Sequence, residues 1–120
     1  MERALGIGGV FLRAEDPQAL RAWYEANLGI PIESWGGNAF VADAGDATVW
    51  SIFPAETEYW PAAKQCMVNY RVRDLGAMLA QLRAAGAEVD DRVEEQEFGR
   101  FGWATDPEGN RIELWQPATS

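Results

Sequence analysis

The fold of this chain is decided near its end, by residues 98–115, which have the sequence FGRFGWATDPEGNRIELW. The central DPEG at 106–109 has the residues of a tight turn. Asp holds the first position through its side chain, Pro presets φ at the second, and Gly accepts the positive φ that closes a hairpin. The β-favouring residues on both sides therefore predict a strand, a turn and a strand.

The register of this hairpin brings a carboxylate among aromatic side chains. If the strands pair across a three-residue loop from Asp106 to Asn110, Trp103 lies opposite Glu113 and the neighbouring aromatic residues 101 and 115 lie opposite each other. All four side chains then share one sheet face. Glu113 is consequently the first candidate for a functional site.

Two helices are predicted upstream, each preceded by a capping aspartate and ended by a glycine. Asp16 precedes Pro17 at the first helical position, and Gly29 supplies the stop; Asp74 and Gly86 play the same parts in the second half. The apolar residues at helical spacing are Leu20, Trp23, Tyr24 and Leu28 in the first helix, and Leu75, Met78, Leu79 and Leu82 in the second. The interval between the aspartates nearly equals that between the glycines, which indicates an internal duplication.

Strands surround each predicted helix in the same order. The expected strands are residues 7–13, 30–35, 39–42 and 47–53 in the first half, and 65–72, 88–95 and the two hairpin strands in the second. The order βαβββ therefore occurs twice. We predict one domain over residues 1–120, with module one at about 5–54, module two at about 65–117, and a connector at 54–64 that is either a lid carrying Tyr59 and Trp60 or a simple crossover.

Alternation along the strands separates the two faces of the predicted sheet. The face for the helices carries Val10, Leu12, Val68, Tyr70, Val72, Ile112 and Leu114. The opposite face carries Phe11, Arg13, Trp50, Met67, Asn69, Arg71, Arg111, Glu113 and Trp115. A curved face of this mixed kind forms a groove, and simple solvation of its polar members is the alternative.

The duplicated order, the Trp23-Tyr24 and Leu28-Gly29 pairs of the first helix, and the ending DPEGNRIEL at 106–114 resemble the vicinal oxygen chelate superfamily. This superfamily includes glyoxalase I, bleomycin resistance proteins and extradiol dioxygenases. The resemblance covers nearly the whole chain. It implies an α+β fold in which two βαβββ modules form a curved mixed sheet, with helices on the convex face, a site on the concave face, and a homodimer.

The metal ligands of the superfamily's enzymes are not matched in this chain. They come from the first and last strands of each module and are usually His, Glu or Gln. The corresponding positions here are Gly9, Trp50, Met67 and Glu113, and the chain contains no His. Only Glu113 can ligate a divalent ion, which needs several oxygen or nitrogen donors. We therefore predict neither a metal nor another cofactor.

The expected function is binding of a flat or cationic small molecule in an aromatic groove, as the bleomycin resistance proteins do, with no catalytic residue assigned. The predicted ligand-binding residues are Phe11, Trp50, Asn69, Arg71, Phe101, Trp103, Glu113 and Trp115. Two alternatives are a glyoxalase- or dioxygenase-like lyase, isomerase or oxygenase with an atypical site, and a partner domain with tryptophans at its interface. Glu113 itself is either a ligand anchor or an arginine-paired structural carboxylate.

The composition indicates which classes of partner the chain binds and in which cellular compartment it works. The net charge of −9 disfavours nucleic acid and anionic membranes. Cys66 is the single cysteine, so no internal disulfide can form, and its apolar neighbours predict a buried, inert thiol. We expect no signal peptide, because the first residues lack an apolar run, and we expect no membrane span, because no apolar stretch reaches the roughly 20 residues needed to cross a bilayer. A cytoplasmic protein is expected.

Overall fold

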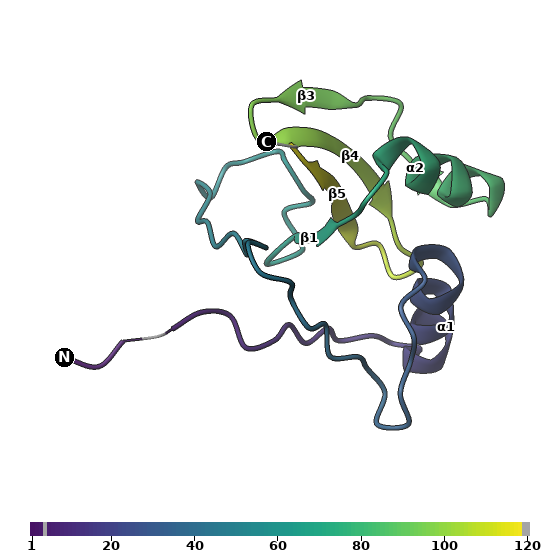
Figure 1. Ribbon diagram of the computed structural model, residues 1–120. Coiled ribbons are helices and arrows are strands. Elements are labelled where there is room, and N and C mark those ends of the chain that lie inside the picture. The colour runs from purple at the N-terminus through teal and green to yellow at the C-terminus, as the bar shows by residue number, and fades with distance from the viewer. Residues whose placement is uncertain (4, 119–120) are drawn as a thin grey trace.

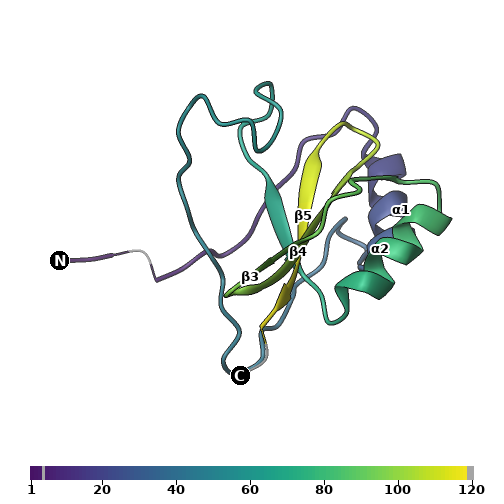
Figure 2. The ribbon, with the colours of Figure 1, turned by 90° about the horizontal axis from the view of Figure 1, so that it is seen from above.

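Two helices cover one face of a five-stranded mixed sheet in the computed structural model, which describes residues 1–3 and 5–118 (Figures 1 and 2). The elements are α1 Pro17–Leu28, β1 Val68–Arg71, α2 Leu75–Ala84, β2 Glu88–Val89, β3 Glu94–Gln96, β4 Gly99–Thr105 and β5 Arg111–Pro117. Both helices lie on the same side of the sheet, and the connector lies on the other (Figure 2). The predicted α+β class is confirmed.

The helices begin and end where their capping residues predict. The Asp16 side chain accepts a hydrogen bond from the backbone N–H of Ala19, and Asp74 accepts one from Ala77. Gly29 ends α1 at φ +67°, a left-handed conformation that suits glycine. Neither helix is long and apolar enough to cross a membrane, and no other helix of the described residues is.

The sheet is built around the predicted hairpin. Strand β5 pairs antiparallel with β4 and parallel with β1, while β2 and β3 follow one another along the other side of β4. The backbone of Asp106 donates to that of Asn110 at 2.9 Å, as the turn chemistry predicts. The predicted strand at 88–95 is interrupted at residues 90–93, where the chain leaves the ladder before β3 resumes it.

The hydrophobic core lies between the sheet and the helices. Its buried members are Leu20, Tyr24, Leu75, Leu79, Leu82, Ala104, Ile112 and Leu114. Helix α2 packs closely on β4 at Gly102, where there is little room for a larger residue. A Cβ atom at this position would lie only 3.0 Å from the Leu79 side chain. Of the predicted helix-facing positions of module two, Ile112 and Leu114 therefore belong to the core, and Tyr70 and Val72 pack against it while partly buried.

The predicted strands of module one are wrong for this structure. Residues 7–13, 30–35, 39–42 and 47–53 form no strand within the described part of the chain. Val10 and Leu12, which we expected beneath the helices, are 57% and 43% exposed. Alternation records a local preference for extended backbone, but a strand also needs a neighbouring edge with which to exchange hydrogen bonds. These segments are extended without such a partner.

Candidate functional site

The helix-free face of the sheet presents two rows of side chains, each crossing three strands. In the first row Asn69, Glu113 and Trp103 are aligned by the register of β1, β5 and β4. The second row contains Arg71, Trp115 and Phe101. The pairings predicted for the hairpin are thus confirmed, and the structure brings together six of the eight residues proposed for ligand binding.

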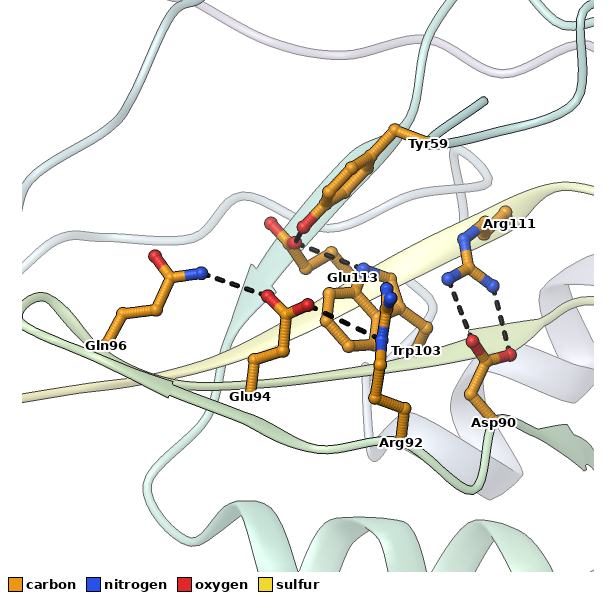
Figure 3. Close-up of polar contacts among 8 residues, drawn as sticks. All are labelled: Tyr59, Asp90, Arg92, Glu94, Gln96, Trp103, Arg111 and Glu113. Carbon is orange, nitrogen blue, oxygen red and sulfur yellow. Dashed lines mark hydrogen bonds and ion pairs between the residues drawn. The ribbon is translucent and has the colours of Figure 1, made fainter. Parts of the chain in front are cut away.

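Glu113 is the most densely bonded side chain of the first row. It is only 8% exposed. Its Oε1 accepts a hydrogen bond of 2.7 Å from Asn69 Nδ2, and its Oε2 accepts one of 3.1 Å from Trp103 Nε1. The hydroxyl of Tyr59 also donates to Oε2 (Figure 3). Three neutral donors therefore hold this carboxylate in place.

No arginine of the described chain forms an ion pair with Glu113, so the arginine-paired interpretation is wrong. Arg111 instead forms a bidentate pair with Asp90, at 2.9 and 3.0 Å (Figure 3). Arg71 donates to the carbonyl of Ala47 at 2.7 Å and lies 3.6 Å from the carboxylate of Asp46. The negative charge of Glu113 is left without a cationic partner among the described residues.

Trp103 is enclosed, although it lies on the helix-free face. Its side chain is 0% exposed. The ring of Tyr59 meets it edge-on with centroids 5.8 Å apart, and the guanidinium groups of Arg92 and Arg111 lie 4.6 and 5.4 Å from its centroid. A ligand that stacks on Trp103 must first displace one of these neighbours. The open aromatic surface predicted at this residue is closed in the structure.

The second row is more accessible. Phe101 and Trp115 stack with centroids 6.2 Å apart and planes inclined by 6°, and both are half-buried. The indole of Trp115 donates to the carbonyl of Phe98 at 3.0 Å, which fixes its orientation. A flat ligand can therefore reach the aromatic wall here, beside the row that contains Glu113.

The other two predicted ligand-binding residues lie outside both rows. Phe11 and Trp50 are 94% and 72% exposed, in the extended segments of module one. Phe11 lines a separate cavity of about 760 Å³, together with Tyr24 and Cys66. The prediction that Cys66 is buried is wrong. Cys66 lies before the start of β1 and is exposed.

The sequence indicates Tyr59 as a candidate lid residue, but it does not indicate that the Tyr59 hydroxyl donates to Glu113. Burial, with a further contribution from its hydrogen bond to Glu113, raises the pKa of Tyr59, so the phenol is a neutral donor at physiological pH. Asp90 and Arg92 were missed altogether. Nothing in the pattern at 88–95 indicates the break in the strand that directs their side chains toward Arg111 and Trp103.

The residues around Glu113 do not fit a metal centre of the superfamily. Two of its neighbours, Trp103 and Tyr59, donate hydrogen bonds to it, and an indole N–H has no lone pair to offer a metal. Within the described residues no three His, Cys, Asp or Glu side chains gather in a way that could hold an ion. Glu113 alone supplies too few ligands.

Comparison with known families decides the classification. Residues 9–115 match the family model of the glyoxalase-like domain. The chain belongs to this family. Its membership confirms the resemblance to the vicinal oxygen chelate superfamily that the closing hairpin and the repeated order indicated. No curated protein sequence matches the chain.

Several solved structures share the fold of this glyoxalase-like domain. TnmS3, an antibiotic binding protein from Streptomyces sp. CB03234, is 24% identical with a TM-score of 0.62, and the match covers 96% of this chain and 100% of that one. TioX from Micromonospora sp. ML1 is 20% identical with a TM-score of 0.55, covering 88% and 93%. A glyoxalase/bleomycin resistance protein/dioxygenase superfamily member from Sphaerobacter thermophilus is 18% identical with a TM-score of 0.52, covering 86% and 90%. At these identities the likeness concerns the fold.

Proposed function

We propose that this glyoxalase-like domain binds a flat, cationic small molecule on the helix-free face of its sheet, without a metal and without catalysing a reaction. The observation that carries the proposal is the buried charge of Glu113. Buried carboxylates are normally paired with a cation or bound to a metal, and neither partner is found among the described residues. A cationic group of a ligand supplies the missing charge.

The surroundings of Glu113 support a flat ligand. Phe101 and Trp115 form a stacked aromatic wall in the next row of the sheet, and aromatic faces attract cations as well as flat rings. TnmS3, which shares this fold, is an antibiotic binding protein, and this supports a small molecule as the ligand. Phe11 and Trp50 lie outside both rows of the sheet face. We propose that they contribute to the site only when the chain forms a homodimer.

We further propose a cytoplasmic homodimer. The accessible surface of the chain is 9081 Å², whereas a compact monomer of this mass exposes about 6,500 Å². The difference is roughly 2,600 Å² per chain, or about 5,200 Å² for a dimer, which is at the upper end of the total area that obligate dimers bury, about 2,000 to 5,000 Å² or more. Much of it comes from apolar side chains of module one, including Val41, Val49, Trp50 and Ile52. A second copy that pairs with these extended segments completes their strands.

The dimer predicts a specific effect of Val49→Glu. Val49 is 73% exposed in a segment with strand preference, so in a dimer its replacement places a charge at the interface, and we expect the mass in sedimentation equilibrium to fall from twice 13.3 kDa to the monomer value. Ala44→Glu makes the same charge change at an exposed turn and is expected to leave the dimer intact. A monomeric wild type at micromolar concentration contradicts the proposal.

The binding proposal is tested by Glu113→Gln. The amide keeps the acceptor for Tyr59 and Trp103, while a flipped Asn69 can accept from its NH₂, so the variant removes the charge with little change in shape. In a thermal-shift screen of cationic aromatic compounds we expect hits on wild type whose affinity falls about tenfold or more in the variant, because a charge-assisted bond is lost.

Glu97→Gln is the matched control, since it removes the same charge at an exposed position and so accounts for nonspecific attraction by the net charge of −9. Equal binding by both variants contradicts the site. A stoichiometric metal in protein purified without added metal contradicts the metal-free proposal and favours the lyase or oxygenase alternative.

A further inference from the structure

Glu113 has a donor from each of three different chain segments, and these donors are not equally replaceable. Asn69 and Trp103 belong to β1 and β4, where the register with β5 fixes them opposite Glu113. Tyr59 belongs to the connector, on the side of the sheet away from the helices. A ligand that approaches Glu113 from that side meets Tyr59 first (Figure 3).

The connector is organised so that Tyr59 presents both its ring and its hydroxyl to the site. Its ring packs against Phe53 with centroids 5.5 Å apart and against Trp103 at 5.8 Å. Farther along, the Trp60 indole donates to the carbonyl of Lys64 at 3.0 Å, and Lys64 Nζ donates to the carbonyl of Glu108 at 3.1 Å. The connector is thus attached to the hairpin at Glu113 and at Glu108.

We propose that Tyr59 is an internal competitor of the ligand, which must displace its hydroxyl from Glu113 in order to bind. The inference rests on the proposed function of the site. A neutral hydroxyl that takes the place of Tyr59 exchanges one bond for an equivalent one and gains nothing. A cationic donor forms the same hydrogen bond and adds the attraction between opposite charges, which is strong at a carboxylate shielded from water. Displacement of the Tyr59 hydroxyl therefore has a free-energy cost that a cationic ligand offsets and a neutral analogue does not.

Two shape-matched probes test the threshold by calorimetry: 1-naphthylmethylamine, a cation at neutral pH, and the uncharged 1-naphthylmethanol. We expect the wild type to bind the amine and to show no measurable binding of the alcohol. Tyr59→Phe keeps the ring against Trp103 and removes one of the two donors to Glu113 Oε2, while Trp103 still donates to it. Because the cost of displacement is removed for both probes, the amine is expected to bind about tenfold tighter, and binding of the alcohol becomes measurable.

Tyr24→Phe is the matched control, since it removes the hydroxyl of another tyrosine that donates to a buried carboxylate, Asp106, away from the site. We expect it to lower stability and to leave the affinity for the amine unchanged. Amine binding that is equal in wild type and Tyr59→Phe overturns the competitor role while the proposed function stands. Weaker binding in Tyr59→Phe overturns it as well, because Tyr59 would then contact the bound ligand.

A second readout needs no ligand. Lys64 is the only lysine of the chain, so a protease that cleaves after lysine cuts once, at the C-terminal end of the connector. Release of Tyr59 loosens this segment, and we expect Tyr59→Phe to be cut several times faster than the wild type and than Tyr24→Phe. Equal cleavage rates in Tyr59→Phe and the wild type contradict the role of the Tyr59–Glu113 hydrogen bond in holding the connector on the sheet. If the rates differ as expected but neither probe binds either protein, the proposed function fails, and the competitor role fails with it.

Discussion

Replacement of Asp106 by alanine is expected to lower the free energy of unfolding by about 3 kcal/mol. The side chain is 4% exposed and accepts four hydrogen bonds. Its Oδ2 accepts from the Tyr24 hydroxyl at 2.7 Å and from Asn110 Nδ2 at 2.8 Å, and its Oδ1 accepts from the backbone N–H groups of Glu108 and Asn110 at 2.9 and 3.0 Å. Removal of one carboxylate leaves all of these donors without their acceptor.

The loss involves two elements at once, because Asp106 ties α1 to the turn between β4 and β5. Burial raises the pKa of Tyr24, so its hydroxyl is a donor at every pH at which the protein is handled. Urea unfolding of the variant measures the effect. Asp43→Ala, at an exposed turn position, is the matched control and is expected to change stability by less than about 0.5 kcal/mol. A similar small change for Asp106→Ala contradicts the anchoring role.

The parts of the fold that the sequence predicts correctly are those whose determinants are local. Asp16 and Asp74 cap their helices, and the DPEG turn fixes the register that places Trp103 opposite Glu113. Each of these features is decided by residues within a few positions of one another. Hydrogen-bonding side chains and turn residues act over this distance, so the pattern and the structure agree.

The incorrect predictions of strand pairing in module one and of the Arg111 ion pair concern partners that are distant in the sequence. Residues 47–53 have strand preference, yet their pairing depends on an edge elsewhere, and the structure leaves Val49 and Trp50 exposed. Arg111 was placed on the correct face, but its choice of Asp90 over Glu113 follows from the interruption between β2 and β3. No local pattern encodes either choice.

Trp103 is the residue at which the fold and the proposed site depend on each other, and Trp103→Ala is expected to lower the free energy of unfolding by about 4 kcal/mol. Its side chain is the largest of those that are fully buried. Truncation leaves a cavity beneath Tyr59 and Arg92, and removes the indole N–H that donates to Glu113. Both the packing contribution and the hydrogen-bond contribution act in the same direction.

Two further variants separate these contributions in urea unfolding. Trp103→Phe keeps most of the ring and removes the N–H, so we expect a loss of about 1 to 2 kcal/mol, from the missing bond to a charged group and the smaller ring. Trp35→Ala removes a tryptophan that is 68% exposed and is expected to cost less than about 1 kcal/mol. Equal losses for Trp103→Ala and Trp35→Ala contradict the enclosed position of Trp103. Because Trp103→Ala weakens the fold itself, a loss of ligand binding in that variant does not locate the site. Glu113→Gln and Tyr59→Phe keep the size of the side chain, so their effects on binding report on the charge and on the competing hydroxyl.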